Sequence, residues 1–173
     1  IIPTSSTTSQ LALGDALAIA CMNYKKFGKL DFKKLHPEGS LGAKLKTVED
    51  LMLTGTKIPF VKENLKMESA LKIISEKKLG VLVVKNKKGL TSGITVDGDI
   101  KRASQKNKDF QGLSIKDVMT KNPISVRSDT LAVKALSIMN SKKITSLCVH
   151  NNKNKKKTIG ILHIHTILEA NIQ

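Results

Sequence analysis

The sequence predicts an α/β (α+β) fold in which two tandem βαββα units pack sheet against sheet. The main observation is an internal repeat: residues 49–52 (EDLM) return as 116–119 (KDVM), and residues 93–95 (GIT) return as 160–162 (GIL), each 67 positions later. Both copies also alternate helical and strand patterns in the same order. The 173 residues, of which 40% are hydrophobic, suffice for two small domains with real cores.

Each unit is expected to open with a short helix that ends at a methionine and to continue with a brief strand. An amphipathic helix, a solid apolar strand, a strand with a Gly-Ile step and a closing helix follow. These elements are placed at Met52, 58–61, 67–78, 81–84, Gly93 and Asp97 in the first unit, and at Met119, 124–126, 131–142, 147–149, Gly160 and His163 in the second. Helices then cover one face of each sheet, so the other faces pack together and clefts between the units are natural ligand sites.

Before the repeat, residues 11–22 predict a helix that is apolar on most sides. Such a helix needs to be buried, and the residues after it do not look able to cover it. We therefore expect a fragment of a larger protein, or a helix that docks on a partner chain. Hydroxyl side chains at residues 4–9 predict a capped helix start. The other interpretation of this cluster is a phosphate site at the helix N-terminus.

Several classes of protein are excluded by composition. No apolar run approaches the roughly 20 residues of a membrane span, which predicts no membrane partner. Asp15 interrupts the apolar stretch and no basic region precedes it, which argues against a signal peptide. Cys21 and Cys148 have neither the spacing of a disulfide framework nor that of a zinc ribbon, so a cytoplasmic location is expected.

The charge is strongly positive, with 30 Lys and Arg against 14 Asp and Glu. Only Arg102 and Arg127 are arginines, and aromatic residues make up 3% of the chain, so side chains that read or stack on bases are nearly absent. The lysine run at residues 153–157 is interpreted as a solvated loop between strands. We expect no nucleic-acid partner.

A histidine lies in a loop between the first helix and the repeat, in the run 36–42 (HPEGSLG). Its ring titrates near neutral pH and stands next to flexible glycine backbone, which suits a catalyst. A lone loop histidine is more often a surface residue, so His36 is open to both interpretations on this evidence.

From residue 46 onward the repeated motifs resemble a tandem cystathionine-β-synthase (CBS) domain pair. Residues 3–8 (PTSSTT), 14–18 (GDALA) and 36–42 resemble the end of a sugar-isomerase (SIS) domain. This order, with 160–165 (GILHIH), is similar to the D-arabinose-5-phosphate isomerase family. The resemblance implies three regions: an incomplete, helical SIS tail at 1–45, a first CBS repeat at 46–107 and a second at 108–173.

The resemblance implies an activity for the full-length parent. The family interconverts D-ribulose 5-phosphate and D-arabinose 5-phosphate and so supplies the precursor of the lipopolysaccharide sugar Kdo. The reaction needs a base near neutral pKa and donors for an oxyanion. The family assigns catalysis to the position of His36, although Glu38 replaces a glycine there and Ala43 stands where arginine is common. The family's phosphate loop and other catalytic residues lie earlier, so the 173 residues alone are expected to be inactive and to require no cofactor.

The resemblance also implies a regulatory ligand between the repeats, either an adenine nucleotide or a nucleotide-sugar such as CMP-Kdo. The family motif places a hydroxyl toward phosphate and a carboxylate on ribose. The first repeat keeps Asp99 but has Val96 at the hydroxyl position, and the second has His163 and Thr166 at the two positions. The expected cleft residues are Ile58, Pro59, Leu79, Gly80, Val81, Val96, Asp97, Asp99, Ile144, Thr145, Ser146, His163, His165 and Thr166.

The same residues allow other interpretations. His163 and His165 would share a face on a strand, but no cysteine or carboxylate motif completes a metal site, so none is predicted. The family implies a homo-oligomer, a CBS dimer or a tetramer, and the pair's role is then either ligand binding or holding subunits together. The alternative function is a stand-alone CBS protein for ligand sensing or oligomerisation, with no isomerase activity.

Overall fold

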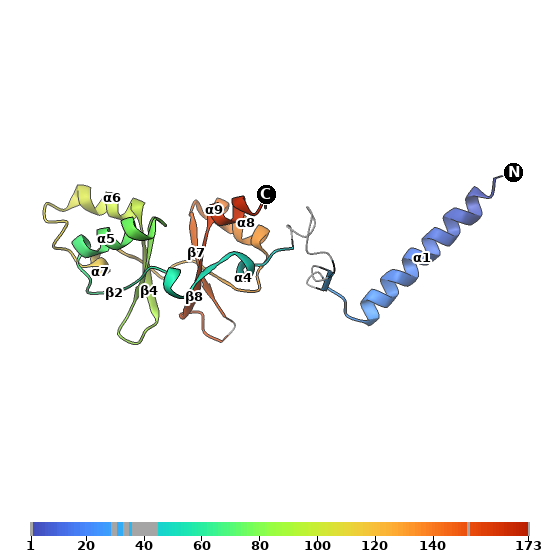
Figure 1. The fold of residues 1–173 in the computed structure, drawn as a ribbon, viewed down its shortest axis with the longest axis horizontal. Coiled ribbons are helices and arrows are strands. Elements are labelled where there is room, and N and C mark those ends of the chain that lie inside the picture. Colours follow the sequence, from blue (N-terminus) through green and yellow to red (C-terminus); the bar gives the residue numbers. More distant parts are fainter. Residues whose placement is uncertain (1, 29–30, 33–34, 36–44, 152, 173) are drawn as a thin grey trace. The chain divides into compact units, whose positions relative to one another are not determined.

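The computed structural model describes residues 2–28, 31–32, 35, 45–151 and 153–172. The chain divides into two compact units, residues 1–45 and residues 46–173. Figure 1 labels the helices and strands of both units. Among the described residues, no helix has the length and the hydrophobicity that a membrane crossing requires.

The first unit contains the helix α1, Thr4–Tyr24, which extends the predicted helix at both ends. The expected hydroxyl cap is wrong, because the helix begins directly after Pro3 and the hydroxyl residues lie inside its first turns. There the Thr8 and Ser9 hydroxyls donate to carbonyl oxygens four residues earlier, at 2.9 Å each. Hydroxyl side chains inside a helix commonly bond back to the preceding turn in this way.

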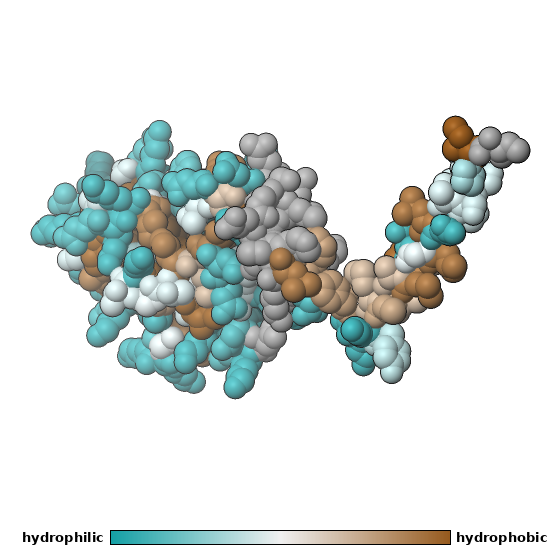
Figure 2. All heavy atoms as spheres, turned by 45° about the vertical axis from the view of Figure 1, so that its right-hand side comes forward, coloured by the Kyte–Doolittle hydropathy of each residue, from teal (hydrophilic) through white to brown (hydrophobic). Residues whose placement is uncertain are grey.

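No residue of α1, all of which are described, is buried within the chain. Its exposed apolar side chains include Leu11, Leu13, Leu17 and Ile19, and Figure 2 shows the apolar colour along the helix. The expectation that this helix needs a partner to cover it therefore stays open.

The second unit holds both predicted repeats. The first repeat supplies α4 (Val48–Leu51), β1 (Leu53–Thr54), the 3₁₀ turn η1 (Gly55–Lys57), β2 (Phe60–Lys62), α5 (Met67–Lys77), β3 (Val81–Lys85), β4 (Thr91–Val96) and α6 (Asp97–Lys106). The second supplies α7 (Ile115–Val118), β5 (Thr120–Lys121), β6 (Ser125–Arg127), α8 (Ala132–Lys142), β7 (Ser146–His150), β8 (Thr158–His163) and α9 (Ile164–Glu169). The predicted elements are all present, with ends moved by a few residues.

The strands form two four-stranded sheets, in the orders β2-β3-β4-β5 and β1-β8-β7-β6. Each sheet therefore takes one edge strand from the other repeat: β5 pairs with β4, and β1 pairs with β8. The short strands β1 and β5 were not predicted, because two residues carry no periodicity. The repeats of the sequence are consequently not the halves of the structure, since their opening segments are exchanged.

The repeated glycines and methionines explain how the exchanged segments fit. Met119 lies over Gly93, and Met52 lies over Gly160. A Cβ atom at Gly93 would lie 2.9 Å from the Thr120 carbonyl oxygen, closer than real contacts allow. The glycine and the methionine that recur in both repeats are thus needed for the exchanged segments to pack against the sheets.

Apolar residues on β3 alternate between two cores. Val81 and Val83 belong to the cluster between the sheets, together with Cys148 and Ile161 of the other sheet. Leu82 and Val84 pack instead under α5 and α7, and a corresponding cluster lies under α4, α8 and α9. A strand that is buried on both faces has consecutive apolar residues, as β3 does. The prediction of two sheets that face each other, with helices outside, is confirmed (Figure 1).

Candidate ligand-binding cleft

A cleft of about 390 Å³ lies where the two repeats meet. The first repeat contributes the end of β4 and the start of α6, and the second contributes the segment after β5 and the turn between α8 and β7. The lining residues are Ile94, Val96, Gly98, Asp99, Arg102, Thr120, Asn122, Pro123, Ile124, Lys143, Ile144, Thr145 and Ser146.

Asp99 is the buried carboxylate of this cleft. One carboxylate oxygen accepts from the Val96 backbone N–H at 3.1 Å, which fixes the first turn of α6. The other accepts from the Arg102 guanidinium at 2.5 Å and from the Thr120 hydroxyl at 3.3 Å. A buried carboxylate needs such partners. The two side-chain donors are the ones that a ligand hydroxyl can replace, because the backbone bond belongs to the helix.

Two cations stand at the cleft. The Arg102 side chain is largely exposed beyond its bond to Asp99, and Lys143 ends α8 in the left-handed conformation, with φ 53°. This backbone turn points the chain back into β7, which brings residues 144–146 to the cleft wall. An anionic group of a ligand therefore has two charged partners here.

The hydroxyl of Ser146 is buried in the wall of the cleft. It lies at the start of β7 on the cleft wall, and its Oγ atom is buried without a hydrogen-bond partner among the described residues. A buried unpartnered hydroxyl costs about 1–3 kcal/mol. A ligand that offers a donor or an acceptor at this point removes that cost.

Within the part of the chain that the structure describes, Thr95 has the other buried hydroxyl without a hydrogen-bond partner. It pairs across the sheet with Leu82, which packs on the helix side, whereas Val96 packs between the sheets. This register turns Thr95 away from the face that carries Val96. Its hydroxyl is therefore no substitute for the one missing at Val96.

The remaining predicted residues lie at the positions that the repeat makes equivalent to the 390 Å³ cleft. Gly80, with φ +61°, holds the close approach of Asp97, whose N–H donates to the Gly80 carbonyl at 3.2 Å. Ile58, Pro59 and Val81 are buried, Leu79 and Thr166 are half-buried, and His165 is exposed. The structure thus divides the predicted set, and only Val96, Asp99, Ile144, Thr145 and Ser146 line the 390 Å³ cleft.

His163 caps the start of α9. Its Nδ1 atom accepts from the His165 backbone N–H at 3.3 Å, and the two rings lie 5.0 Å apart. Burial, and then the neighbouring His165, lower the pKa of His163. Both effects disfavour the charged ring, so His163 is a weak cation for the phosphate that the family motif places at this position. Within the described ranges, no three His, Cys, Asp or Glu side chains gather as metal ligands would.

Several residues of the cleft were not predicted from the sequence, and one predicted residue, His36, lies outside the described residues. Arg102, Thr120 and Lys143 line it without belonging to any motif that was used. Thr120 directly follows the repeated methionine, which is a signal that the sequence did contain.

Comparison with known proteins agrees with this architecture. The arabinose 5-phosphate isomerase KdsD of Escherichia coli K12 is 42% identical over 99% of this chain and 52% of that protein. The chain spans about half the length of the curated relatives it matches. Among solved structures, CBSX2 in complex with AMP has a TM-score of 0.62 and 29% identity over 73% of this chain and 96% of that one.

A conserved protein of Pyrococcus horikoshii shares the fold, with a TM-score of 0.66 and 23% identity over 75% of this chain and 95% of that one. The family model for the CBS domain matches residues 48–106 and residues 115–172. The two matches correspond to the two repeats seen in the sequence. The chain belongs to the CBS domain family and carries a tandem CBS pair.

Proposed function

We propose that this chain is the regulatory CBS-pair portion of an arabinose 5-phosphate isomerase. The observation that carries the proposal is the 42% identity to KdsD, which extends over 99% of the chain and so includes the residues before the CBS pair. In this proposal the parent enzyme interconverts ribulose 5-phosphate and arabinose 5-phosphate, and His36 acts in that reaction.

The ligand proposed for the CBS pair is an adenine nucleotide in the 390 Å³ cleft. CBSX2, a relative in fold at 29% identity, was solved in complex with AMP. The cleft supports this class of ligand through a buried carboxylate, two cations and an unpartnered hydroxyl. Asp99 would accept from ribose hydroxyls in place of Thr120, and Arg102 and Lys143 would face the phosphate.

A thermal-shift and calorimetric comparison tests the ligand. The chain is titrated with AMP, ADP, ATP, arabinose 5-phosphate and CMP-Kdo. A ligand at 100 times its dissociation constant stabilises the folded state by about 2.7 kcal/mol, which corresponds to roughly 5–10 °C in a chain of this size. Preference for CMP-Kdo would replace the adenine nucleotide with the pathway product, and no shift with any compound would refute a nucleotide site.

A matched pair of variants locates the site. Lys143→Gln removes a cleft charge, whereas Lys142→Gln removes the same charge one residue earlier, outside the cleft. We expect the first to weaken nucleotide binding at least fivefold and the second to leave it within twofold. Equal effects would place the ligand elsewhere.

The isomerase assignment has its own test. The complete gene product should convert ribulose 5-phosphate to arabinose 5-phosphate, and the ligand found above should change its rate. The 173-residue chain alone should show no turnover. Light scattering of both proteins tests the proposed homo-oligomer. A complete product without turnover would favour a stand-alone CBS sensor.

A further inference from the structure

A second and larger hollow lies at the other end of the first sheet. It has a volume of about 970 Å³ and is formed by the ends of β2 and β3, the β3–β4 turn and the segment around α7. We call it the lysine groove, and its lining residues are Lys62, Glu63, Asn64, Lys66, Lys85, Asn86, Lys87, Gly89, Ser114 and Lys116. Five of the ten are lysines and one is acidic.

The lysine groove is separate from the nucleotide cleft. Strands β3 and β4 run antiparallel, so Lys85 pairs with Thr91 at the groove end and Val81 pairs with Val96 at the cleft end. Five steps along β4 separate the two ends, or about 17 Å at ~3.4 Å per residue. A ligand of one site does not fill the other.

Two of the groove lysines have defined contacts. The Lys85 ammonium lies 3.2 Å from the centroid of the Phe60 ring, and Lys66 donates to the Gly112 carbonyl at 2.6 Å. Burial, and then the charge of Lys157, lower the pKa of Lys85. Both effects disfavour the charged ammonium, and a bound anion would favour it again.

The second repeat shows that the fold does not require these lysines. Arg127 pairs with His150 across its sheet as Lys62 pairs with Lys85, but its guanidinium is tied to Asp129, with Nε 2.8 Å from the carboxylate. Leu131 bridges to Thr47 as Lys66 bridges to Ser114. The Glu49 N–H donates to the Ser128 carbonyl as the Lys116 N–H donates to the Glu63 carbonyl. The surface beside the first sheet is thus basic, whereas the matching surface beside the second sheet has its arginine paired and a glutamate in place of Lys116.

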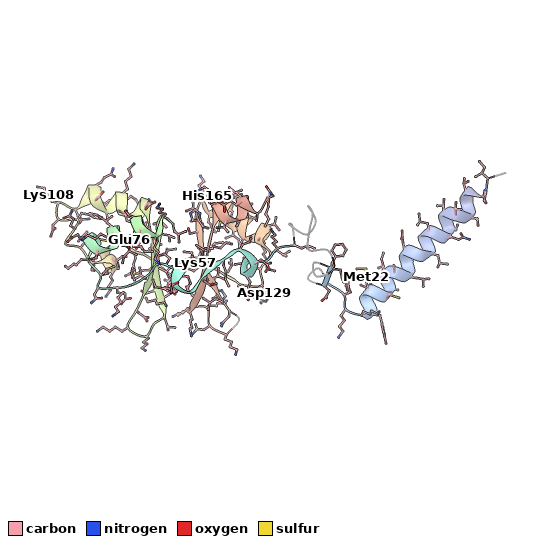
Figure 3. All side chains as sticks on the ribbon, viewed as in Figure 1. Met22, Lys57, Glu76, Lys108, Asp129 and His165 are labelled. Carbon is pink, nitrogen blue, oxygen red and sulfur yellow. The ribbon has the colours of Figure 1, made fainter. Side chains whose placement is uncertain are left out.

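The neighbouring hairpins extend the positive field. The Thr91 N–H donates to the Lys156 carbonyl at 2.8 Å, so the two hairpin ends lie side by side. Residues 86–90 and 151–157 contain six lysines and no acidic residue. Figure 3 shows long side chains extending from both hairpin ends, on the side away from His165. An anion that approaches this end meets a predominantly positive field.

From this geometry we propose that the lysine groove binds a compact oligophosphate, a small molecule with two or more linked phosphate groups. Ammonium groups act as point charges and recognise charge density rather than planar or base-edge patterns. The Phe60 ring already has Lys85 over its face, which disfavours base stacking there. Five lysines in one hollow exceed what a single phosphate needs.

Calorimetry of the 173-residue chain with inorganic tripolyphosphate in about 150 mM salt tests this proposal. Inorganic monophosphate at matched ionic strength is the reference, and it should bind at least tenfold more weakly. The double variant Lys62→Gln/Lys116→Gln should lose at least tenfold in affinity for tripolyphosphate. The control Lys134→Gln/Lys142→Gln, which removes the same charge from exposed positions on α8, should stay within twofold.

The outcomes separate this site from the cleft and from diffuse charge. Lys143→Gln should leave tripolyphosphate binding unchanged while it weakens nucleotide binding. Absence of saturable binding, or equal losses in the two double variants, would overturn the proposal. Tight binding of duplex DNA or of anionic vesicles that tripolyphosphate does not displace would also overturn it, because the occupant would then be a macromolecule.

Discussion

Replacing Gly160 by alanine should destabilise the CBS pair although alanine suits the local backbone. The new Cβ would lie 3.0 Å from Met52 Cγ and 3.2 Å from the Leu53 carbonyl oxygen, and its nearest neighbour would be Met52 Sδ. Leu53 cannot move freely, since it is held in the β1–β8 pair. Overfilling a packed site typically costs about 1–3 kcal/mol, whereas the smaller entropy of an unfolded alanine returns about 0.4–1 kcal/mol.

The net loss of about 1–2 kcal/mol lowers the melting temperature by roughly 2–8 °C in a chain of this size. Differential scanning calorimetry measures it, with Gly98→Ala as the control, because a Cβ there would meet only the flexible end of Arg102. Adding Met52→Ala to Gly160→Ala should show a coupling free energy of about 1 kcal/mol in a double-mutant cycle. A Gly160→Ala chain that melts at or above the parent temperature would refute the close packing of the exchanged segment.

Three further outcomes are expected. The pKa of His163 is lower in the folded chain than in the unfolded chain, so the unfolded chain binds the proton more readily. The free energy of unfolding therefore falls as the pH drops below about 6.5. The variant His163→Gln should make the melting temperature depend less on pH between pH 7 and 5. Burial raises the pKa of the Cys148 thiol to about 11, so Ellman's reagent at pH 8 should titrate only Cys21 in the native chain and both thiols in denaturant. The Thr91 and Thr158 hydroxyls bond at 2.7 Å between the two sheets, so each valine replacement should cost about 1 kcal/mol, and the double replacement should cost less than the sum, as measured by urea unfolding.

The order of the elements was predictable because it depends on local patterns that the repeat states twice. The helix α5 begins at Met67 as predicted and ends one residue early, at Lys77. The exchange of β1 and β5 was not predictable, because it is decided by contacts between residues that are not neighbours in sequence: Leu53 pairs with Ile161, 108 positions later, and Gly93 pairs with Lys121, 28 positions later. The repeated glycine and methionine lie at these contacts, but a single sequence does not show whether each methionine packs on the glycine of its own repeat or on that of the other repeat.

The site was predictable to a smaller extent. Asp99 was predicted because residues 93–99 resemble the CBS site motif, in which a carboxylate follows a glycine at a fixed distance. Lys143 and Arg102 reach the same cleft through a left-handed helix end and the second turn of α6, and neither feature has a motif. The hydroxyl cap on α1 failed for a related reason: Thr8 and Ser9 have the composition of a cap, but Pro3 set the helix start several residues earlier.

Comparison of equivalent positions in the two repeats indicates which residues the fold requires. Positions that hold the exchanged segments are the same in both copies, as with Gly93 and Gly160 under their methionines. Positions at the ends of the strands differ in chemical type, as with Asp99 against Thr166 at one end and Lys116 against Glu49 at the other. Because one backbone accepts both residues at each place, stability alone does not explain the choice. The differences between the repeats are therefore where ligand specificity is to be sought, and they coincide with the cleft and with the lysine groove.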